Sequence, residues 1–459
     1  MPGSDARLTS KQMAAPASKP SSHRIVIVGG GAAGLELATK LGNRSSRAVR
    51  GVNIHTTLID RSAIHIWKPL LHKAAAGSLE VSTQEVEYLA QAHRHNFAFQ
   101  EGEMVAVDRT RNTVTLAPVI DEENVEILPQ RIVEYDTLVL AIGSETNFFG
   151  VRGTNEHALR IDTIAQAEHF HRRLVSVCMR LQSGLSTFGP DNNLRRINVV
   201  VIGAGATGVE LAAELRDASK VLATYGLYDV VPADHIQITV VDSGKRILPQ
   251  LPQELADKSA AMLQSLGIAM LVDEQVSEVQ ENAVLTASGK RLPSDITVWT
   301  AGTKMPAILT TLGLATSKSG QVLVNQSLQS QSDQNIFAMG DCAACPWPGH
   351  ERGVPPLAQA AHQQASAMLT ILEAHIARRP MPVFQYHDRG TLLALGEHNA
   401  LGELGAGRHA VRVNGALARM AYFSLYRTHV LALHGWIYML VDTLNHWLRG
   451  KTSPHVKLH

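Results

Sequence analysis

Two glycine-rich loops have the spacing at which a protein backbone binds the diphosphate of a dinucleotide. The first follows the β-branched run 24–28 and reads Gly29-Gly30-Gly31-Ala32-Ala33-Gly34. The second follows a similar run, 197–202, and reads Gly203-Ala204-Gly205-Ala206-Thr207-Gly208. Glycines at these places allow a tight turn and a close approach to phosphate, and the helix that follows directs free amide groups at the negative charge. Because each loop joins a predicted strand to a predicted helix, the sequence predicts two dinucleotide-binding units.

An acidic residue ends the next predicted strand after each loop. These residues are Asp60 and Asp242. A carboxylate in this place accepts hydrogen bonds from ribose hydroxyls and repels a 2′-phosphate. Asp242 therefore favours NADH over NADPH if the second unit binds a nicotinamide. Lys245 and Arg246 lie close behind Asp242 and weaken that preference.

A third feature of this kind is the Gly340-Asp341 pair at the end of the predicted strand 335–339. Its carboxylate could accept from a ribitol hydroxyl while a following helix points at phosphate, and a plain turn is the alternative. Two more predicted strands run into Gly143 and Gly302. Strands that alternate with helical patterns predict an α/β fold with two Rossmann-like domains.

Composition limits what else the chain can be. Of its 459 residues, 45% are apolar and 18% are charged, which excludes a disordered regulator and predicts two or three domains. A formal net charge of +1 gives no electrostatic case for binding nucleic acid. Only three cysteines are present, which indicates a reducing compartment. The single CxxC, Cys342 to Cys345, cannot form a four-sulfur zinc site, so we expect inert thiols and no metal.

Neither end of the chain predicts a membrane-spanning helix. Residues 1–22 are rich in Ser, Pro and Ala and lack the apolar core of a secretory signal, so we expect a disordered leader. In the apolar tail, the longest stretch without a charge, 428–441, has 14 residues, and a spanning helix needs about 18 or more. The tail is basic, because seven Lys or Arg and one acid, Asp442, follow residue 404.

Together these features resemble the flavoprotein reductases with two dinucleotide domains, in which FAD occupies the first loop and the Gly-Asp pair, and NAD(P)H the second loop. Four stretches resemble the bacterial type II NADH:quinone oxidoreductases, the respiratory NADH dehydrogenases that do not pump protons. They are 65–72 (HIWKPLLH), 205–210 (GATGVE), 340–346 (GDCAACP) and 355–363 (PPLAQAAHQ). The likeness covers everything after the leader.

The resemblance implies how the chain is divided. A FAD domain would comprise 23–155 and 319–385, interrupted by an NAD(H)-binding domain at 156–318, and 386–459 would be a C-terminal membrane-anchoring region. The residues expected at non-covalent FAD are Gly29, Gly30, Gly31, Ala32, Ala33, Gly34, Asp60, Arg61, Lys68, Gly143, Gly340, Asp341, Ala358 and Gln359. Those expected at NADH are Gly203, Gly205, Thr207, Gly208, Glu210, Asp242 and Gly302.

The stretch 358–363 resembles the signature that this family uses at the quinone head group beside the flavin. Two prolines precede it, so Gln359 should lie in the first turn of a helix, with Gln363 at i+4 on the same face. A neutral amide can donate to a quinone carbonyl without bringing charge into an apolar tunnel. The alternative is a polar helix face in solvent.

Glu210 falls in the first turn of the second dinucleotide helix, where the helix dipole favours any acid. The resemblance places it near the nicotinamide and the flavin, where it could orient NADH or take part in proton delivery. We take it, with Gln359 and Gln363, as a catalytic candidate, although the cofactors carry the hydride chemistry.

Residues 419–449 concentrate apolar and aromatic side chains between basic ones. Such a segment is typical of a helix that lies in a membrane interface, with aromatic rings at headgroup depth and cations on anionic lipid. A homodimer interface would use similar residues, and the two roles can coexist.

The sequence thus predicts an NADH dehydrogenase that passes two electrons from NADH through FAD to a membrane quinone, attached peripherally to the cytoplasmic face of the inner membrane. One alternative is an enzyme like sulfide:quinone oxidoreductase, which needs a cysteine pair elsewhere and lacks an intact second glycine loop. Another is a flavin-bearing, NAD(H)-binding signalling protein with slow turnover, against which 358–363 argues. The kind of quinone, the oligomeric state and the position of any quinone-site lysine stay open.

Overall fold

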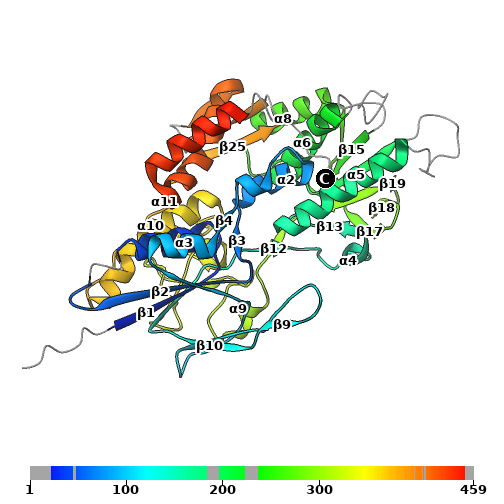
Figure 1. Cartoon of the computed structure of the whole chain (residues 1–459). Coiled ribbons are helices and arrows are strands. Elements are labelled where there is room, and N and C mark those ends of the chain that lie inside the picture. The colour runs from blue at the N-terminus through cyan, green and yellow to red at the C-terminus, as the bar shows by residue number, and fades with distance from the viewer. Residues whose placement is uncertain are drawn as a thin grey trace, which may run out of the picture.

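A computed structural model describes residues 22–44, 48–182, 196–222, 236–396, 399–405, 407 and 410–449 (Figure 1). The expected leader, apart from Ser22, and the residues after 449 lie outside these ranges.

The first half of the fold is built on a five-stranded parallel sheet in the order β23-β11-β1-β2-β5. Its central strands contain the buried apolar runs 25–28 and 138–140, as expected of parallel strands covered by helices on both faces. Helix α1 (Ala32–Gly42) packs against α10 (Ala358–Ile376). The strands are β1 (Ser22–Val28), β2 (Asn53–Asp60), β5 (Ala98–Glu101), β11 (Thr137–Leu140) and β23 (Ile336–Ala338).

A second parallel sheet, in the order β13-β20-β14-β15-β16, lies beside the first and repeats its design. Its strands are β13 (Ala158–Leu159), β14 (Ile197–Ile202), β15 (Ile236–Val241), β16 (Ile268–Leu271) and β20 (Ile296–Trp299). Its helices are α5 (Ile164–Gln182), α6 (Ala206–Leu222) and α8 (Gln253–Ser265). All the strands of this second sheet come between β11 and β23 in the chain. The presence of two Rossmann-like sheets confirms the predicted fold class.

Small antiparallel sheets extend each half. On the first they are β6 (Met104–Asp108), β7 (Thr113–Leu116) and β10 (Arg131–Glu134), with the hairpin β8 (Val119–Ile120) and β9 (Glu126–Leu128). On the second they are β17 (Val276–Gln280), β18 (Ala283–Thr286) and β19 (Arg291–Pro293). The two chain crossings between the halves pair with each other as β12 (Glu145–Thr146) and β21 (Thr303–Lys304).

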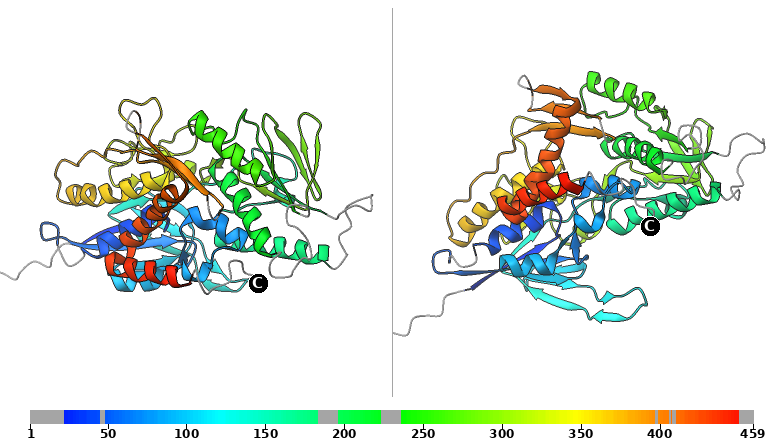
Figure 2. Two further views of the ribbon diagram at one scale, coloured as in Figure 1. Left: turned by 90° about the horizontal axis from the view of Figure 1, so that it is seen from above. Right: turned by 45° about the horizontal axis from the view of Figure 1, so that its top comes forward.

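The C-terminal region begins with a sheet that the sequence did not predict. Strands β25 (Gly390–Leu395), β26 (Asn399–Leu404) and β27 (Val411–Asn414) are antiparallel, and β25 packs against α6. Helix α11 (Gly415–Arg449) follows and bends at Gly435, whose φ is 81°. Figure 2 shows α11 lying along the first half, where it contacts α1. None of the helices among the described residues combines the length and apolarity that crossing a membrane requires.

Shorter elements connect these parts. They are β3 (Ile64–His65), η1 (Lys68–Leu70), α2 (Leu71–Ala76), η2 (Val81–Thr83), β4 (Val86–Glu87), α3 (Tyr88–His95), α4 (Thr154–His157), α9 (Ile308–Thr311), β22 (Val322–Leu323), η4 (Gly340–Cys342) and β24 (Ala343–Ala344).

Candidate active site

The first glycine loop joins β1 to α1 in a shape that requires glycine at positions 29 and 34. Gly29 has a φ of +106°, and its N–H donates to the Ile59 carbonyl at 2.8 Å. A Cβ on Gly34 would lie 1.8 Å from the Gly29 carbonyl oxygen, so the helix and the loop approach as closely as glycine allows. A Cβ on Gly31, at the N-cap of α1, would meet nothing within 4 Å. The loop therefore leaves open space at the positive end of α1, where a diphosphate fits.

The second loop, between β14 and α6, repeats this geometry. Gly203 has a φ of +111°, and a Cβ on Gly208 would lie 1.9 Å from the Gly203 carbonyl oxygen. A Cβ on Gly205 would meet nothing within 4 Å. Thr207 lies in the first turn of α6, as Ala32 and Ala33 do in α1. Each half of the molecule thus has one site with the shape that a dinucleotide diphosphate needs.

The two strand-end acids hold these loops in place. The Gly30 N–H donates to Oδ2 of Asp60 at 2.6 Å, and the Ala204 N–H donates to Oδ2 of Asp242 at 2.6 Å. The other carboxylate oxygens accept from Ser62 and Gly244 in the following turns. Because each oxygen has two lone pairs, each acid can still accept from a ribose hydroxyl. Burial raises the pKa of Asp60, while the backbone hydrogen bonds oppose that rise.

The expected flavin-side residues meet where β11 and β23 end. Ser144 donates from Oγ to Asp341 at 2.8 Å, and Lys68 donates from Nζ to the Ser144 carbonyl at 3.4 Å. A Cβ on Gly143 would lie 3.3 Å from the same Nζ. Arg61 is more distant, 3.7 Å from Glu145 in an exposed ion pair. The structure therefore brings together Lys68, Gly143 and Asp341, although they are far apart in sequence.

The helix expected directly after Gly340-Asp341 is absent, so that prediction is wrong. Gly340 has a φ of +71° and opens only the single 3-10 turn η4, after which β24 pairs with β22. The next helix is α10, whose Gln364 accepts from the Gly340 N–H at 2.6 Å. It is α10, beginning at Ala358, that points its N-terminus into this region.

The CxxC thiols and Cys178 are buried, and none of the three forms a disulfide. Burial raises the pKa of Cys342 to about 12 and that of Cys345 to about 11. Thiols with such pKa values are poor nucleophiles at neutral pH. Among the described residues no His, Cys, Asp and Glu gather into a metal site.

Gln359 and Gln363 lie on one face of α10, as predicted, and both amides are engaged with the chain that leads to β25. Gln359 donates to the Gly390 carbonyl at 3.0 Å and accepts from the Arg389 N–H at 3.0 Å. Gln363 donates to the His387 carbonyl at 2.8 Å and accepts from the His387 N–H at 3.0 Å. The pair thus fixes segment 387–390, and its role toward quinone stays a prediction.

Glu210 is buried where α6, β25 and α11 meet. It accepts from the Ala394 N–H at 3.0 Å, and the Tyr422 hydroxyl of α11 hydrogen-bonds to it. Burial raises the pKa of Glu210 to about 7 and lowers the pKa of His72 to about 3. The 3.9 Å between His72 Nδ1 and Glu210 is therefore a contact between a neutral imidazole and a carboxyl, and it is too long for a hydrogen bond. Sequence reasoning missed Tyr422, which it assigned to the anchor alone.

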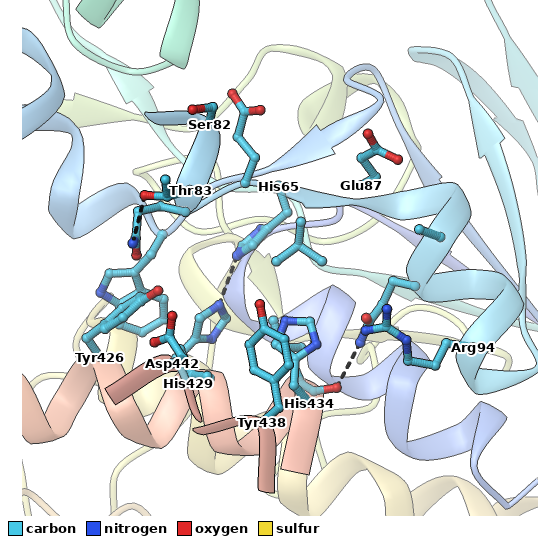
Figure 3. Close-up of a pocket in the computed structure, with 18 residues that line it drawn as sticks. His65, Ser82, Thr83, Glu87, Arg94, Tyr426, His429, His434, Tyr438 and Asp442 are labelled. Carbon is cyan, nitrogen blue, oxygen red and sulfur yellow. Dashed lines mark hydrogen bonds between the residues drawn. The ribbon is translucent and has the colours of Figure 1, made fainter. Parts of the chain in front are cut away.

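A cavity of about 270 Å³ opens between α11 and the segment from η2 to α3 (Figure 3). At its inner end the buried rings of His65 and His429 hydrogen-bond through their Nε2 atoms, 3.0 Å apart. His65 donates from Nδ1 to the Gly30 carbonyl at 2.9 Å, so its Nε2 must accept and His429 must donate. Burial lowers the pKa of His65 to about 4, which keeps this ring neutral. His65 therefore separates the cavity from the first glycine loop and contacts both.

Comparisons with known proteins agree with this arrangement. The family model of the pyridine nucleotide-disulphide oxidoreductases matches residues 23–365. The chain is 37% identical over 450 residues to the type II NADH:quinone oxidoreductase of Haemophilus influenzae, covering 95% of this chain and 99% of that protein. It is 29% identical over 385 residues to the enzyme of that name from Staphylococcus aureus, covering 83% and 89%.

Two solved structures have a similar fold. NDH2 from Plasmodium falciparum in complex with NADH matches with a TM-score of 0.78 and 18% identity, covering 95% of this chain and all of that one. The sulfide:quinone oxidoreductase from Aquifex aeolicus matches with a TM-score of 0.68 and 18% identity, covering 94% and 96%. At such identities the likeness concerns the fold alone.

Proposed function

The chain belongs to the type II NADH:quinone oxidoreductases, within the pyridine nucleotide-disulphide oxidoreductase family, and we propose from this premise that it passes two electrons from NADH through FAD to a membrane quinone. The observation that carries the proposal is the repeated loop geometry, with open space at Gly31 and again at Gly205. One diphosphate site serves FAD and the other NADH.

The residues of the first half fit FAD. The space at Gly31 and the N-terminus of α1 suit its diphosphate, Asp60 suits a ribose, and Asp341 with Lys68 stands where a ribitol and the ring would follow. When bound, FAD accepts a hydride from NADH and delivers two electrons to the quinone. The α10 N-terminus, beginning at Ala358, favours negative charge on the group in front of it.

On the NADH side, Gly205 leaves room for the diphosphate and Asp242 accepts from the ribose and disfavours a 2′-phosphate. Arg246, which could have countered this preference, donates to the carbonyls of Pro249 and Leu251. Glu210, held by Ala394 and Tyr422, is a buried carboxyl whose pKa of about 7 lets it hold or release a proton at neutral pH.

On the quinone side, the cavity between α11 and α3 gives a ring a route toward the flavin loop. The pKa of His429 is lowered by burial and, to a lesser degree, by neighbouring imidazoles that include His362 of α10, which stands between Gln359 and Gln363. We propose that the route from the cavity continues toward these two glutamines. We assign these amides to holding segment 387–390 and to donating to a quinone carbonyl.

Membrane attachment uses the outer face of α11. Trp436 and Ile437 are each 63% exposed and Leu440 is 53% exposed, close to the basic end of the chain. Burying such side chains contributes about 1.5 to 3 kcal/mol each, and the cations add attraction to anionic lipid. We place this face on the cytoplasmic side of the inner membrane, where NADH is available. A homodimer that uses the same face is the competing arrangement.

The membrane test must spare the core, because His429 and Leu433 of α11 are buried. Trp436, Ile437 and Leu440 are exchanged together for serine, and co-sedimentation with anionic vesicles is compared with the parent protein. The matched control exchanges Ile120, Ile127 and Ile132, which are equally exposed on the first half, for serine. Release of the first variant and retention of the control support the proposal, whereas retention of both refutes it.

The sulfide-oxidising alternative needs reactive thiols. All three cysteines are buried, and the pKa values of Cys342 and Cys345 are raised. The proposal predicts that purified, FAD-loaded protein reduces a short-chain quinone with NADH and not with sulfide. Reduction with sulfide and not with NADH would replace the proposal by the alternative.

A further inference from the structure

Helix α11 consists of two segments joined at Gly435. This residue has a φ of 81° and a ψ of 175°, a backbone conformation that is open essentially to glycine alone. A Cβ there would meet nothing within 4 Å, so the bend requires glycine for its backbone shape and not for lack of space. A bend of this kind is where a helix can change direction.

The first segment, 415–434, is firmly docked. His429 is 5% exposed and Leu433 1%, and Gln91 of α3 donates to the Leu433 carbonyl at 2.9 Å. The hydrogen bond between His429 and His65 fixes the same stretch to the first glycine loop. Moving this segment would break buried contacts.

The second segment, 436–449, is held in place by fewer contacts. None of its described side chains, 436–445, is buried. Asp442 forms an ion pair with Arg427 of the first segment, and the Tyr438 ring lies 4.5 Å from that of His434. Asp442 is also the single acid after residue 404, in a tail with seven Lys or Arg. The ion pair that holds the second segment against the first therefore depends on the one negative charge of the tail, Asp442.

The second segment forms a wall of the cavity. Tyr438 and Asp442 line it beside Tyr426, His429 and His434 of the first segment. Figure 3 shows these side chains together at the α11 side of the cavity. The same segment carries the exposed apolar residues on its other faces. One short helix thus forms a wall of the cavity and offers an apolar face to its surroundings.

We propose that residues 436–449 are a lid over this cavity, hinged at Gly435 and latched by Asp442 and Arg427, and that insertion into an anionic lipid surface opens it. Anionic headgroups compete with Asp442 for Arg427, while the apolar phase draws in Trp436 and its neighbours. This inference rests on the proposed function, because the cavity is the route that we assign to the quinone. The lid would open only where quinone is present.

The test labels a thiol at the inner wall. Val430 is 5% exposed and lines the cavity from the docked segment, and the native cysteines are buried. The FAD-loaded full chain carrying Val430→Cys is treated with a maleimide alone, with phosphatidylglycerol vesicles and with phosphatidylcholine vesicles. Two variants in the same background test the latch and the hinge, Asp442→Asn and Gly435→Ala. Glu403→Gln is the matched control, because it breaks an ion pair with Arg412 away from the lid.

The lid predicts slow labelling of the free protein and labelling faster by at least about threefold with phosphatidylglycerol vesicles, a shift within reach of one ion pair. Asp442→Asn and Gly435→Ala should label fast without vesicles, and neither Glu403→Gln nor phosphatidylcholine should change the rate. A rate that ignores both anionic vesicles and Asp442→Asn overturns the lid.

The same samples are assayed with NADH and a short-chain quinone, which separates the two proposals. Quinone reduction with invariant labelling overturns the lid and leaves the proposed function standing. Labelling that responds as expected, in flavin-loaded protein that does not reduce quinone, supports the lid and overturns the proposed function.

Discussion

Replacing Glu210 by glutamine should stabilise the protein while impairing it. The pKa of the Glu210 carboxyl is raised from 4.5 to about 7, chiefly because the group is buried. Between these two pH values the unfolded chain releases a proton that the folded protein retains, so the free energy of unfolding falls as pH rises. Above pH 7 the buried carboxylate is ionised and lowers the free energy of unfolding by the full amount, up to about 3 kcal/mol. Glutamine does not titrate and avoids it.

The substitution preserves the local contacts. The amide oxygen can still accept from Ala394, and the amide nitrogen can donate to the Tyr422 hydroxyl. The assay is thermal unfolding of flavin-loaded protein at pH 5 and pH 8. Glu210→Gln should match the parent at pH 5 and exceed its Tm by roughly 3 to 6 °C at pH 8, while NADH bleaches its flavin more slowly.

Glu403→Gln is the control, because it removes a carboxylate of the C-terminal region that is not buried. The difference in Tm between this variant and the parent should not grow with pH. An equal Tm difference between Glu210→Gln and the parent at both pH values would refute the claim that Glu210 is a buried carboxyl that keeps its proton up to about pH 7. So would a variant that is less stable than the parent at pH 8. Unchanged flavin reduction in a stabilised variant would instead confine Glu210 to a structural role.

Three further predictions address the individual sites. Asp242→Ala should narrow a preference for NADH over NADPH that we expect to be at least about tenfold in kcat/KM, roughly 1.4 kcal/mol, and equal rates with both donors in the parent would contradict the role of Asp242. Gly205→Ala should raise the KM for NADH without loss of FAD or a lower Tm, because the added Cβ meets only the open space. Gly208→Ala should instead destabilise the second half of the fold. Similar behaviour of the two variants would refute the assignment of the open space to the diphosphate. Gln359→Ala should slow flavin reoxidation by quinone in stopped flow and spare reduction by NADH, with Gln363→Ala for comparison, and equal slowing of both steps would remove Gln359 from the quinone site.

The sequence was most informative where function depends on local order. The two glycine loops could be predicted because a strand, three glycines and a helix follow one another directly in the sequence. The same order of elements predicted that Asp60 and Asp242 lie at strand ends. Gln359 and Gln363 could be assigned to one helix face by their spacing alone. Each of these predictions needed only a few neighbouring residues.

The parts that escaped prediction depend on distant partners. His65 and His429 are 364 residues apart, and nothing near either one indicates that they meet. The contact of Tyr422 with Glu210 depends on how α11 packs on α6 and β25. The helix expected after Asp341 does not form because Ala343 is extended and pairs with β22, which the local sequence does not reveal. The glutamine amides gave a correct face but not their partners in segment 387–390.

The central claim is that one FAD carries electrons from NADH to quinone, and an anaerobic titration tests it most directly. The purified chain should contain about one FAD, one for the single first loop of each chain. Addition of NADH without oxygen should bleach the flavin absorbance, and a short-chain quinone should then restore it. Protein that gains no flavin on reconstitution, or flavin that NADH leaves oxidised or that quinone fails to reoxidise, would contradict the account.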